Sequence, residues 1–220
     1  MMSRQRPSTR TPDIKGLYAV TSDSSDTAEL LRRARLALQG GAQVLQYRNK
    51  TANAALRLTQ AKALRALTDE FSVPFIVNDD VRLAVQVDAD GVHVGAGDAS
   101  LVEARSALGA GRIIGVSCYN RLLHAREAVS AGADYVAFGA FHSSVVKPHA
   151  VVADAVLLRE ARAELDVPLV AIGGITACNG LPLIQAGADA LAVISALFDA
   201  ADIQCAAREI SNLFTQDVVS

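Results

Sequence analysis

The sequence is poor in the residues that mark secreted, membrane-bound or nucleic-acid-binding proteins. It has three cysteines, no tryptophan and a formal net charge of −2 over 220 residues. Cys118, Cys178 and Cys205 lie far apart and form no Cys-x-x-Cys pair. We therefore expect free, buried thiols in a reducing, cytoplasmic compartment. No basic surplus points to nucleic acid, and no apolar run reaches the roughly 20 residues of a membrane span.

What the sequence does contain is enough apolar material for one sizeable core. Apolar residues make up 51% of the chain and charged residues 20%, which argues against disorder. Residues 1–13 are polar and basic with two prolines, and they predict a flexible N-terminal tail without a signal peptide. No linker or composition break interrupts residues 14–220, so a single domain is expected there.

Short β-branched runs alternate with longer Ala/Leu-rich segments of helical spacing. Strands are predicted at 17–21, 43–47, 74–77, 91–94, 113–116, 135–138, 169–172 and 190–194. Helices are predicted at 27–38, 55–70, 80–86, 102–108, 122–131, 156–165, 180–186 and 205–213. The strand runs are almost continuously apolar, which is typical of parallel strands buried on both faces. Eight such units predict an α/β fold, a single (βα)8 TIM barrel.

A doubly wound open sheet is the alternative fold. It is disfavoured because Thr21–Ser25, after the first predicted strand, lack the glycines of the dinucleotide-binding fingerprint.

A weak internal repeat supports an architecture of regular strand–helix units. Ala-Gln at 42–43 and Ala-Asp at 89–90, 133–134 and 188–189 each precede or open a strand, which indicates tight helix-to-strand turns.

Polar and basic residues gather after the predicted strands, where a barrel of this type carries its site. Arg48, Lys50 and Lys147 follow the second and sixth strands and together can clamp phosphate oxygens, although each alone is explained as a solvated surface charge. Gly173-Gly174 after the seventh strand either admits a phosphate to backbone N–H groups or makes a plain tight turn.

Two carboxylates, Asp79 and Asp98, follow the third and fourth strands. With diphosphate oxygens and water they would complete a Mg²⁺ site. The alternative is a helix N-cap, which we assign to Asp80 and which stays open for Asp98. No Cys/His pair or Gly-x-Ser-x-Gly elbow indicates a covalent nucleophile.

None of the four histidines has the spacing of a metal-ligand set. His93, inside a strand, is expected to pack in the interior or to support a site residue, and His124 is expected on a helix surface. His142 and His149 flank Lys147 in a loop, where they could approach a ligand.

Seven short motifs, in order at the strand ends, resemble the thiamine-phosphate synthase family from about Gly16 to Leu213. They are Gln46-Tyr47-Arg48-Asn49-Lys50, Val77-Asn78-Asp79-Asp80, Gly91-Val92-His93-Val94-Gly95, Gly97-Asp98, Gly115-Val116-Ser117, Ile172-Gly173-Gly174-Ile175 and Val193-Ile194-Ser195. The resemblance implies a transferase of thiamine biosynthesis with Mg²⁺ as cofactor. It would join a hydroxymethylpyrimidine diphosphate to a thiazole phosphate with loss of diphosphate.

The resemblance also implies a role for each matching residue. The pyrimidine diphosphate would be bound by Gln46, Arg48, Lys50, Asn78 and Lys147, and Ser117 would contact its diphosphate. Tyr47 and Asn49, in the same motif, are also expected to bind substrate. Among these, Arg48, Lys50, Ser117 and Lys147 would assist catalysis, while Asp79 and Asp98 would bind Mg²⁺. The thiazole phosphate would be bound by Ser144, Gly174, Ile194 and Ser195. The implied partners are small molecules, and the oligomeric state stays open, a homo-oligomer included.

One loop departs from the family's pattern, and three rival functions share the barrel. The family's Pro-Thr-x-Thr-Lys loop is Ser143-Ser144-Val145-Val146-Lys147 here, so Val146 lacks a hydroxyl that would bind phosphate. The rivals are a thiazole tautomerase, a sugar- or indole-phosphate enzyme, and a non-catalytic binding protein. The paired carboxylates disfavour the first, the absence of a strand Lys or Glu the second, and the full set of cations the third.

Overall fold

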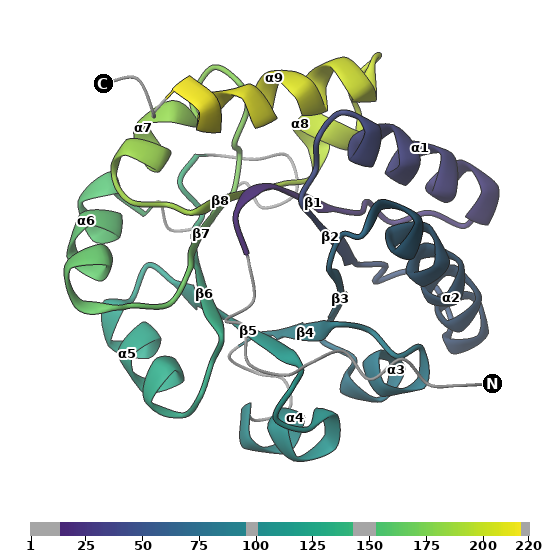
Figure 1. The fold of residues 1–220 in the computed structure, drawn as a ribbon, viewed down its shortest axis with the longest axis horizontal. Coiled ribbons are helices and arrows are strands. Elements are labelled where there is room, and N and C mark those ends of the chain that lie inside the picture. Colours follow the sequence, from purple (N-terminus) through teal and green to yellow (C-terminus); the bar gives the residue numbers. More distant parts are fainter. Residues whose placement is uncertain (1–13, 96–100, 143–152, 217–220) are drawn as a thin grey trace.

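The strands close into a barrel in the computed structural model, which describes residues 14–95, 101–142 and 153–216. Neighbouring strands are parallel, and β1 pairs with β8 from Gly16↔Ala190 to Ala19↔Val193. The strands are β1 (Gly16–Val20), β2 (Val44–Tyr47), β3 (Phe75–Asn78), β4 (Gly91–Val94), β5 (Ile113–Tyr119), β6 (Tyr135–Phe138), β7 (Leu169–Ile172) and β8 (Ala190–Val193). The predicted (βα)8 barrel is confirmed (Figure 1).

Helices form a ring around the strands (Figure 1). They are α1 (Thr27–Gln39), α2 (Ala54–Phe71), α3 (Val81–Gln86), α4 (Leu101–Leu108), α5 (Leu122–Ser130), α6 (Ala155–Glu164), α7 (Leu181–Gln185), α8 (Ser195–Phe198) and α9 (Ile203–Gln216). All eight predicted helices are present, with boundaries moved by a few residues. The sequence did not predict α8, because a single turn is too short for a periodic signal. The predicted tail, residues 1–13, lies outside the described residues.

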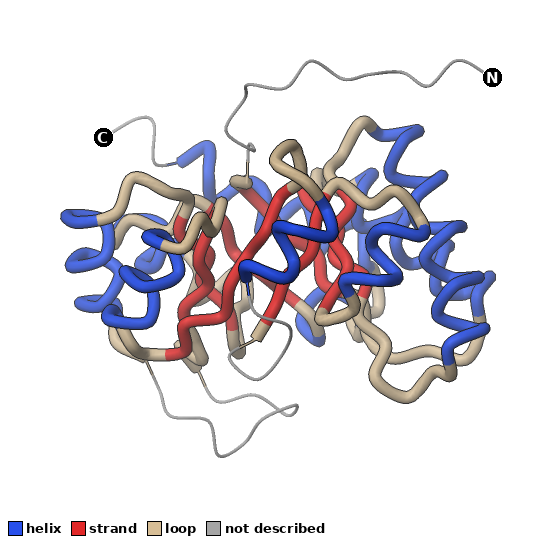
Figure 2. The backbone as a smooth tube through the Cα atoms, turned by 90° about the horizontal axis from the view of Figure 1, so that it is seen from below, coloured by secondary structure: helices blue, strands red, loops and turns tan. Residues whose placement is uncertain are grey.

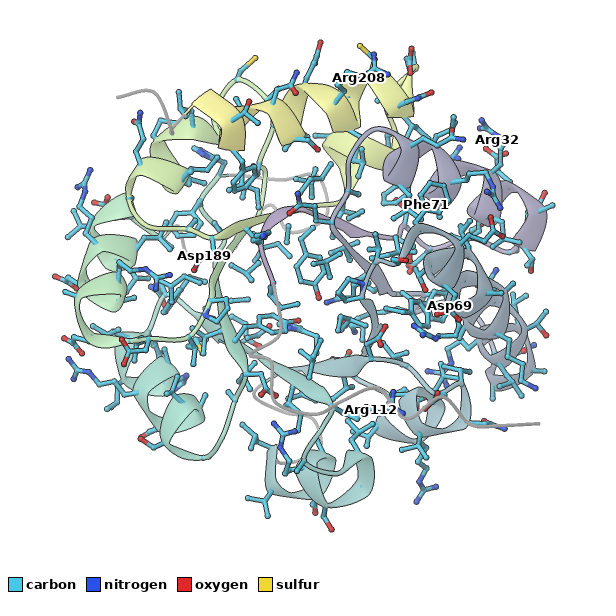
Figure 3. All side chains as sticks on the ribbon, in the orientation of Figure 1. Arg32, Asp69, Phe71, Arg112, Asp189 and Arg208 are labelled. Carbon is cyan, nitrogen blue, oxygen red and sulfur yellow. The ribbon has the colours of Figure 1, made fainter. Side chains whose placement is uncertain are left out.

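The strands bury both faces, and this produces two cores. Alternate side chains point inward, among them Tyr18, Val44, Ile76 and Tyr135, and they form a core inside the barrel. The intervening side chains pack outward against the helices and form the larger core. Figure 3 shows side chains throughout the barrel interior, whereas the labelled Arg208 lies on the outer helix α9.

Three aspartates of the repeated helix-to-strand turns join neighbouring units at the N-terminal end of the barrel. Asp90 accepts hydrogen bonds from the Arg65 guanidinium (2.6 Å) and the backbone N–H of Phe75 (2.8 Å). Asp134 does the same with Arg105 and Ile114 N–H, and Asp189, labelled in Figure 3, with Arg162 and Leu169 N–H. The aspartates of the Ala-Asp repeat therefore stabilise the end of the barrel where the strands begin. Figure 2 shows the loops collected at the two ends of the strands.

Asp90→Ala is expected to lower the free energy of unfolding by about 2 kcal/mol, because it leaves a strand N–H unpaired and leaves Arg65 with only its more exposed partner, Asp69. The Asp90 and Arg65 side chains are well covered, at 13% and 16% exposure. Urea unfolding measures the change. Glu164→Ala is the matched control, since the Arg126–Glu164 pair is exposed (51% and 39%) and should contribute far less to stability. Equal losses in the two variants would contradict the assignment.

The three cysteines are free, as predicted, but only Cys118 is buried. The expectation of buried thiols is wrong for Cys178 and Cys205, which lie on exposed surface of the β7 loop and α9. A cysteine side chain is small and only weakly polar, so the residue type alone does not show whether a given thiol is buried.

Among the described residues, no helix is both long and apolar enough to cross a membrane.

A thiol reagent at about pH 8 should modify two thiols in the folded protein and the third only after unfolding. Burial raises the pKa of Cys118 to about 12, so its reactive thiolate is almost absent below that pH. Counting modified thiols by mass spectrometry with and without denaturant measures this difference. Modification of all three at one rate in the folded protein would contradict it.

Candidate active site

A cavity of about 600 Å³ opens at the C-terminal ends of the strands, and all eight strands or their following loops contribute to its wall. That volume is in the range of small-molecule sites. Seven predicted site residues line it: Gln46, Arg48, Lys50, Asn78, Asp79, Ser117 and Ile194. Residues separated by up to 148 positions thus meet in one hollow, since Gln46 and Ile194 both face it.

The first two strands position the cationic loop. Arg48 and Thr21 are linked twice, because Arg48 N–H donates to the Thr21 hydroxyl and that hydroxyl donates to Arg48 C=O, both at 2.9 Å. Asp23 accepts from the backbone N–H of Lys50 at 2.9 Å and lies 3.4 Å from the Arg48 guanidinium. The Arg48 side chain is 19% exposed and that of Lys50 is 60% exposed. Arg48 is therefore held in place, whereas Lys50 reaches into solvent.

The two adjacent aspartates after β3 have different roles. Asp80 caps α3, because its carboxylate accepts from Leu83 N–H at 2.9 Å, and this prediction is confirmed. Asp79 has a φ of 62° and lines the cavity, with its carboxylate 3.7 Å from the Lys50 ammonium. Its N–H donates to the carbonyl of His93 at 2.8 Å. The left-handed backbone turns the Asp79 carboxylate toward the site while Asp80 begins the helix.

Five polar side chains form a continuous hydrogen-bond chain across the barrel. The Gln46 amide donates to the Tyr18 hydroxyl (2.8 Å), which bonds to the Tyr135 hydroxyl (2.8 Å). The Tyr135 hydroxyl bonds to His93 Nδ1 (2.9 Å), and His93 Nε2 bonds to the Ser117 hydroxyl (2.8 Å). The prediction that His93 packs in the interior is confirmed, and it bonds to the predicted site residue Ser117. Burial raises the pKa of both tyrosines above the usual value, so the phenols stay neutral.

The loops after β6 and β7 approach each other closely. A Cβ on Gly173 would lie 2.4 Å from the Cβ of Ala140, so only glycine fits there, and φ is 104°. The Asn179 side-chain amide donates to the Gly174 carbonyl at 3.0 Å. Gly173 lines the cavity, and Gly174 follows it directly. These contacts hold the Gly-Gly turn at the cavity rim.

Two residues that were predicted to contact substrate, Tyr47 and Asn49, do not line the large cavity. The Tyr47 side chain points away from the cavity because strand neighbours alternate, and its hydroxyl donates to Gln60 at 2.8 Å. Asn49 donates to Ser24 C=O (2.7 Å) and Gln60 (3.0 Å) and accepts from the 51–52 backbone. Both residues are buried and line a neighbouring, smaller hollow of about 240 Å³. Their placement gives them a structural role in the β2 loop.

The remaining predictions divide into adjacent and undescribed positions. Ser195 begins α8, directly after the cavity-lining Ile194. Asp98, Ser144, Lys147 and His149 lie outside the described residues, so their roles stay predictions. The described residues hold no cluster of three His, Cys, Asp or Glu side chains that could bind a metal ion by itself.

Sequence reasoning missed several residues of the cavity wall. His124, expected on a helix surface, lines the cavity from the first turn of α5. Tyr119, Asn120 and Arg121 also line it, after a register shift between Ser117 and Tyr119 at the end of β5. Such irregularities are common at barrel rims and redirect side chains. Their position directly after the fifth strand could have indicated them, but the sequence prediction considered only Ser117 and Cys118 at that strand end.

The chain matches the family model described as thiamine monophosphate synthase over residues 17–197. The chain belongs to this family. It is 53% identical over 202 residues to the thiamine-phosphate synthase of Thiobacillus denitrificans, covering 92% of this chain and 96% of that protein. It is also 53% identical to that of Methylobacillus flagellatus, covering 92% and 97%. The chain is accordingly an enzyme, a transferase of thiamine biosynthesis.

A solved structure agrees with the family assignment. Thiamine phosphate pyrophosphorylase from Pyrococcus furiosus superimposes with a TM-score of 0.84 at 33% identity, covering 94% of this chain and 98% of that one. The resemblance predicted from seven motifs is thereby confirmed for the family and the fold.

Proposed function

We propose that the chain joins a hydroxymethylpyrimidine diphosphate to a thiazole phosphate, giving thiamine phosphate and diphosphate. The observation that carries this proposal is the convergence of Gln46, Arg48, Lys50, Asn78 and Asp79 on one cavity. That wall combines two cations, two amides and one carboxylate, a set suited to a diphosphate with a metal ion. The names of the relatives at 53% identity support the same reaction.

The reaction needs no nucleophile from the protein. The bond between the methylene carbon and the diphosphate oxygen breaks, and its electron pair leaves with the diphosphate. The pyrimidine ring stabilises the resulting cation, and the thiazole nitrogen lone pair then forms the new C–N bond. Arg48 and Lys50 bind the leaving diphosphate oxygens, where negative charge accumulates. Holding both substrates in one cavity supplies the remaining advantage through proximity.

Asp79 is suited to hold Mg²⁺ together with diphosphate oxygens. Mg²⁺ in proteins is usually bound by one or two carboxylates plus substrate phosphates and water. One cavity-facing carboxylate beside the cations therefore fits the ion, and Asp98 is the proposed second carboxylate. When bound, Mg²⁺ neutralises charge on the leaving group. Lys50, 3.7 Å from the Asp79 carboxylate, lies where it can bind the same diphosphate.

The thiazole phosphate is assigned to the opposite side of the cavity, at the loops after β7 and β8. Gly173 and Ile194 line this side, and Gly174 and Ser195 follow them. Backbone N–H groups of a glycine turn bind phosphate closely because no side chain intervenes. Loops after the seventh and eighth strands commonly form such a site in this barrel. Ser144 and Lys147 are proposed to complete the two phosphate sites.

The decisive experiment measures thiamine phosphate formation from the two phosphorylated substrates, with Mg²⁺ and with EDTA. Product only in the presence of Mg²⁺ is the expected result. Folded protein that forms no product with Mg²⁺ would overturn the proposal and favour tautomerase activity or simple binding. Product in EDTA would overturn only the role of the metal. Free thiols fit the proposed cytoplasmic setting, where such an enzyme would meet its substrates.

A further inference from the structure

We propose that Tyr18, Tyr135 and His93 are positioning residues that fix the direction of the Ser117 hydroxyl. The chain of hydrogen bonds holds His93 as the tautomer with hydrogen on Nε2, and the Ser117 O–H then points into the cavity as a donor. In the reaction proposed above, on which this last role rests, its acceptor is a diphosphate oxygen. The inference comes from the order of donors and acceptors across the barrel.

The donor-to-acceptor direction of these hydrogen bonds is set at Gln46. The Gln46 amide nitrogen lies 2.8 Å from the Tyr18 oxygen and donates to it. Tyr18 is 1% exposed, and within the described residues its only other polar partner is the Tyr135 hydroxyl, 2.8 Å away. Tyr18 must therefore donate its own hydrogen to Tyr135, because a buried donor left unpaired is strongly unfavourable.

The same reasoning passes the direction on to Ser117. Tyr135 is fully buried and accepts from Tyr18, so its hydrogen goes to its second partner, His93 Nδ1, at 2.9 Å. A neutral imidazole that accepts at Nδ1 carries its hydrogen on Nε2. His93 Nε2 then donates to the Ser117 oxygen at 2.8 Å. Among the four groups from Tyr18 to Ser117, the Ser117 hydroxyl hydrogen is the one that these hydrogen bonds leave unused.

The opposite direction places the unused hydrogen in the wrong environment. If Ser117 donated to His93 while Gln46 still donated to Tyr18, the surplus hydrogen would fall on Tyr18, which borders the same cavity but is only 1% exposed. In the proposed direction it falls on Ser117, which is partly exposed and lines the cavity. Water or substrate can accept it there. The raised pKa of both tyrosines, caused by burial, keeps both phenolic hydrogens in place at ordinary pH.

The arrangement also explains why the rings of Tyr18, Tyr135 and His93 lie in the barrel interior, a place that aliphatic side chains could fill. The tilted rings of Tyr18 and Tyr135 are 6.1 Å apart, and His93 stacks on Tyr135 at 5.5 Å. Packing and hydrogen bonds together prevent the imidazole from rotating. A donor that is already aimed before substrate binds needs no reorganisation as charge develops on the leaving group.

The tautomer can be measured in the free enzyme, without substrates. Long-range ¹H–¹⁵N NMR of protein labelled in its histidine nitrogens distinguishes the two neutral tautomers, and a His93→Gln variant identifies the His93 signals. The expected result is hydrogen on Nε2, with Tyr135→Phe moving the two nitrogen shifts toward each other. Hydrogen on Nδ1 would mean that Ser117 donates to His93 and that the hydrogen bonds run from Ser117 toward Tyr18, and would overturn the proposal.

A double-mutant cycle tests the consequence for turnover. Tyr135→Phe is expected to lower kcat/KM about 10-fold in the wild-type enzyme, the effect of one hydrogen bond to a charged group. In a Ser117→Ala background it should have almost no further effect, because no hydroxyl remains to be aimed. Equal losses in both backgrounds would overturn the positioning role and leave Tyr135 as a packing residue.

Two further measurements distinguish the positioning role from a general effect of mutation and from the proposed function. Thr68→Val, which removes a buried hydroxyl from α2 away from the cavity, should leave both the His93 signals and kcat/KM unchanged. A change in the His93 signals there would overturn the specific link to Tyr135. If the wild-type enzyme forms no thiamine phosphate yet shows hydrogen on Nε2, the proposed function and the diphosphate acceptor fall while the orientation of Ser117 stands.

Discussion

Asp79→Asn is expected to lower kcat for thiamine phosphate formation by about 100- to 1,000-fold while changing stability little. The substitution removes one negative charge from the proposed Mg²⁺ ligand and keeps the size of the side chain. Asparagine also tolerates the left-handed backbone at this position, where φ is 62°, better than alanine does. The loss therefore reports on the carboxylate and not on backbone strain. Steady-state kinetics over a range of Mg²⁺ concentrations would also show a weaker apparent affinity for the ion.

The neighbouring aspartate is a matched control for this variant. Asp80→Asn removes the same charge one residue further on, but asparagine caps a helix as well as aspartate does. Its weak ion pair with Arg57, at 3.5 Å and 30–37% exposed, should contribute well under about 1 kcal/mol. We expect near-normal turnover. If Asp79→Asn retained full activity, or if the two variants lost equal activity, Asp79 would not be the metal ligand.

Arg48→Ala is expected to lower kcat/KM for the pyrimidine diphosphate by about 100-fold, equivalent to roughly 3 kcal/mol from lost charge-assisted hydrogen bonds. The Arg48 side chain is 19% exposed, its backbone is held by Thr21 and its guanidinium lies 3.4 Å from Asp23, so little entropy is lost when it binds an anion. Arg48→Lys should recover only part of the activity, since lysine keeps the charge but cannot bind two oxygens in parallel.

Substrate dependence distinguishes a binding role for Arg48 from a general loss of fold. The KM for the thiazole phosphate should change far less than that for the diphosphate, because Arg48 lies on the β2 side of the cavity. Arg32→Ala, which removes an exposed guanidinium from α1, should leave kinetics unchanged (Figure 3). A uniform rise of both KM values, or unaltered kinetics in Arg48→Ala, would argue against a diphosphate contact.

The sequence predicted the barrel because its signals are local and repeat eight times. Each apolar run reports a strand buried on both faces, and each Ala/Leu-rich segment reports a helix that covers one. The family motifs follow these strands, so strand order alone placed Arg48, Asn78 and Asp79 at one end of the barrel. Asp80 was separable from Asp79 by the same local logic, since a cap must immediately precede its helix.

Which way a side chain points beyond a strand end was not predictable in this manner. Tyr47 and Asn49 belong to the same motif as Gln46 and Arg48, yet their polar groups bond to Gln60 on α2. Strand alternation could have flagged Tyr47, but Asn49 lies in a loop whose path depends on Ser24 and Asp23 of another unit. Contacts between units far apart in sequence leave no periodic trace.

By itself the sequence determined the fold class, the end of the barrel that carries the site, and the family, because these follow from local periodicity and from motifs read in order. Only the tertiary structure decided which of those residues share the cavity and what holds them there. The hydrogen bonds from Gln46 through Tyr18, Tyr135 and His93 to Ser117 join five strands, and the bond from Tyr18 on β1 to Tyr135 on β6 links two strands that do not pair with each other. Hydrogen bonds between such strands depend on ring positions and distances that exist only in the closed barrel.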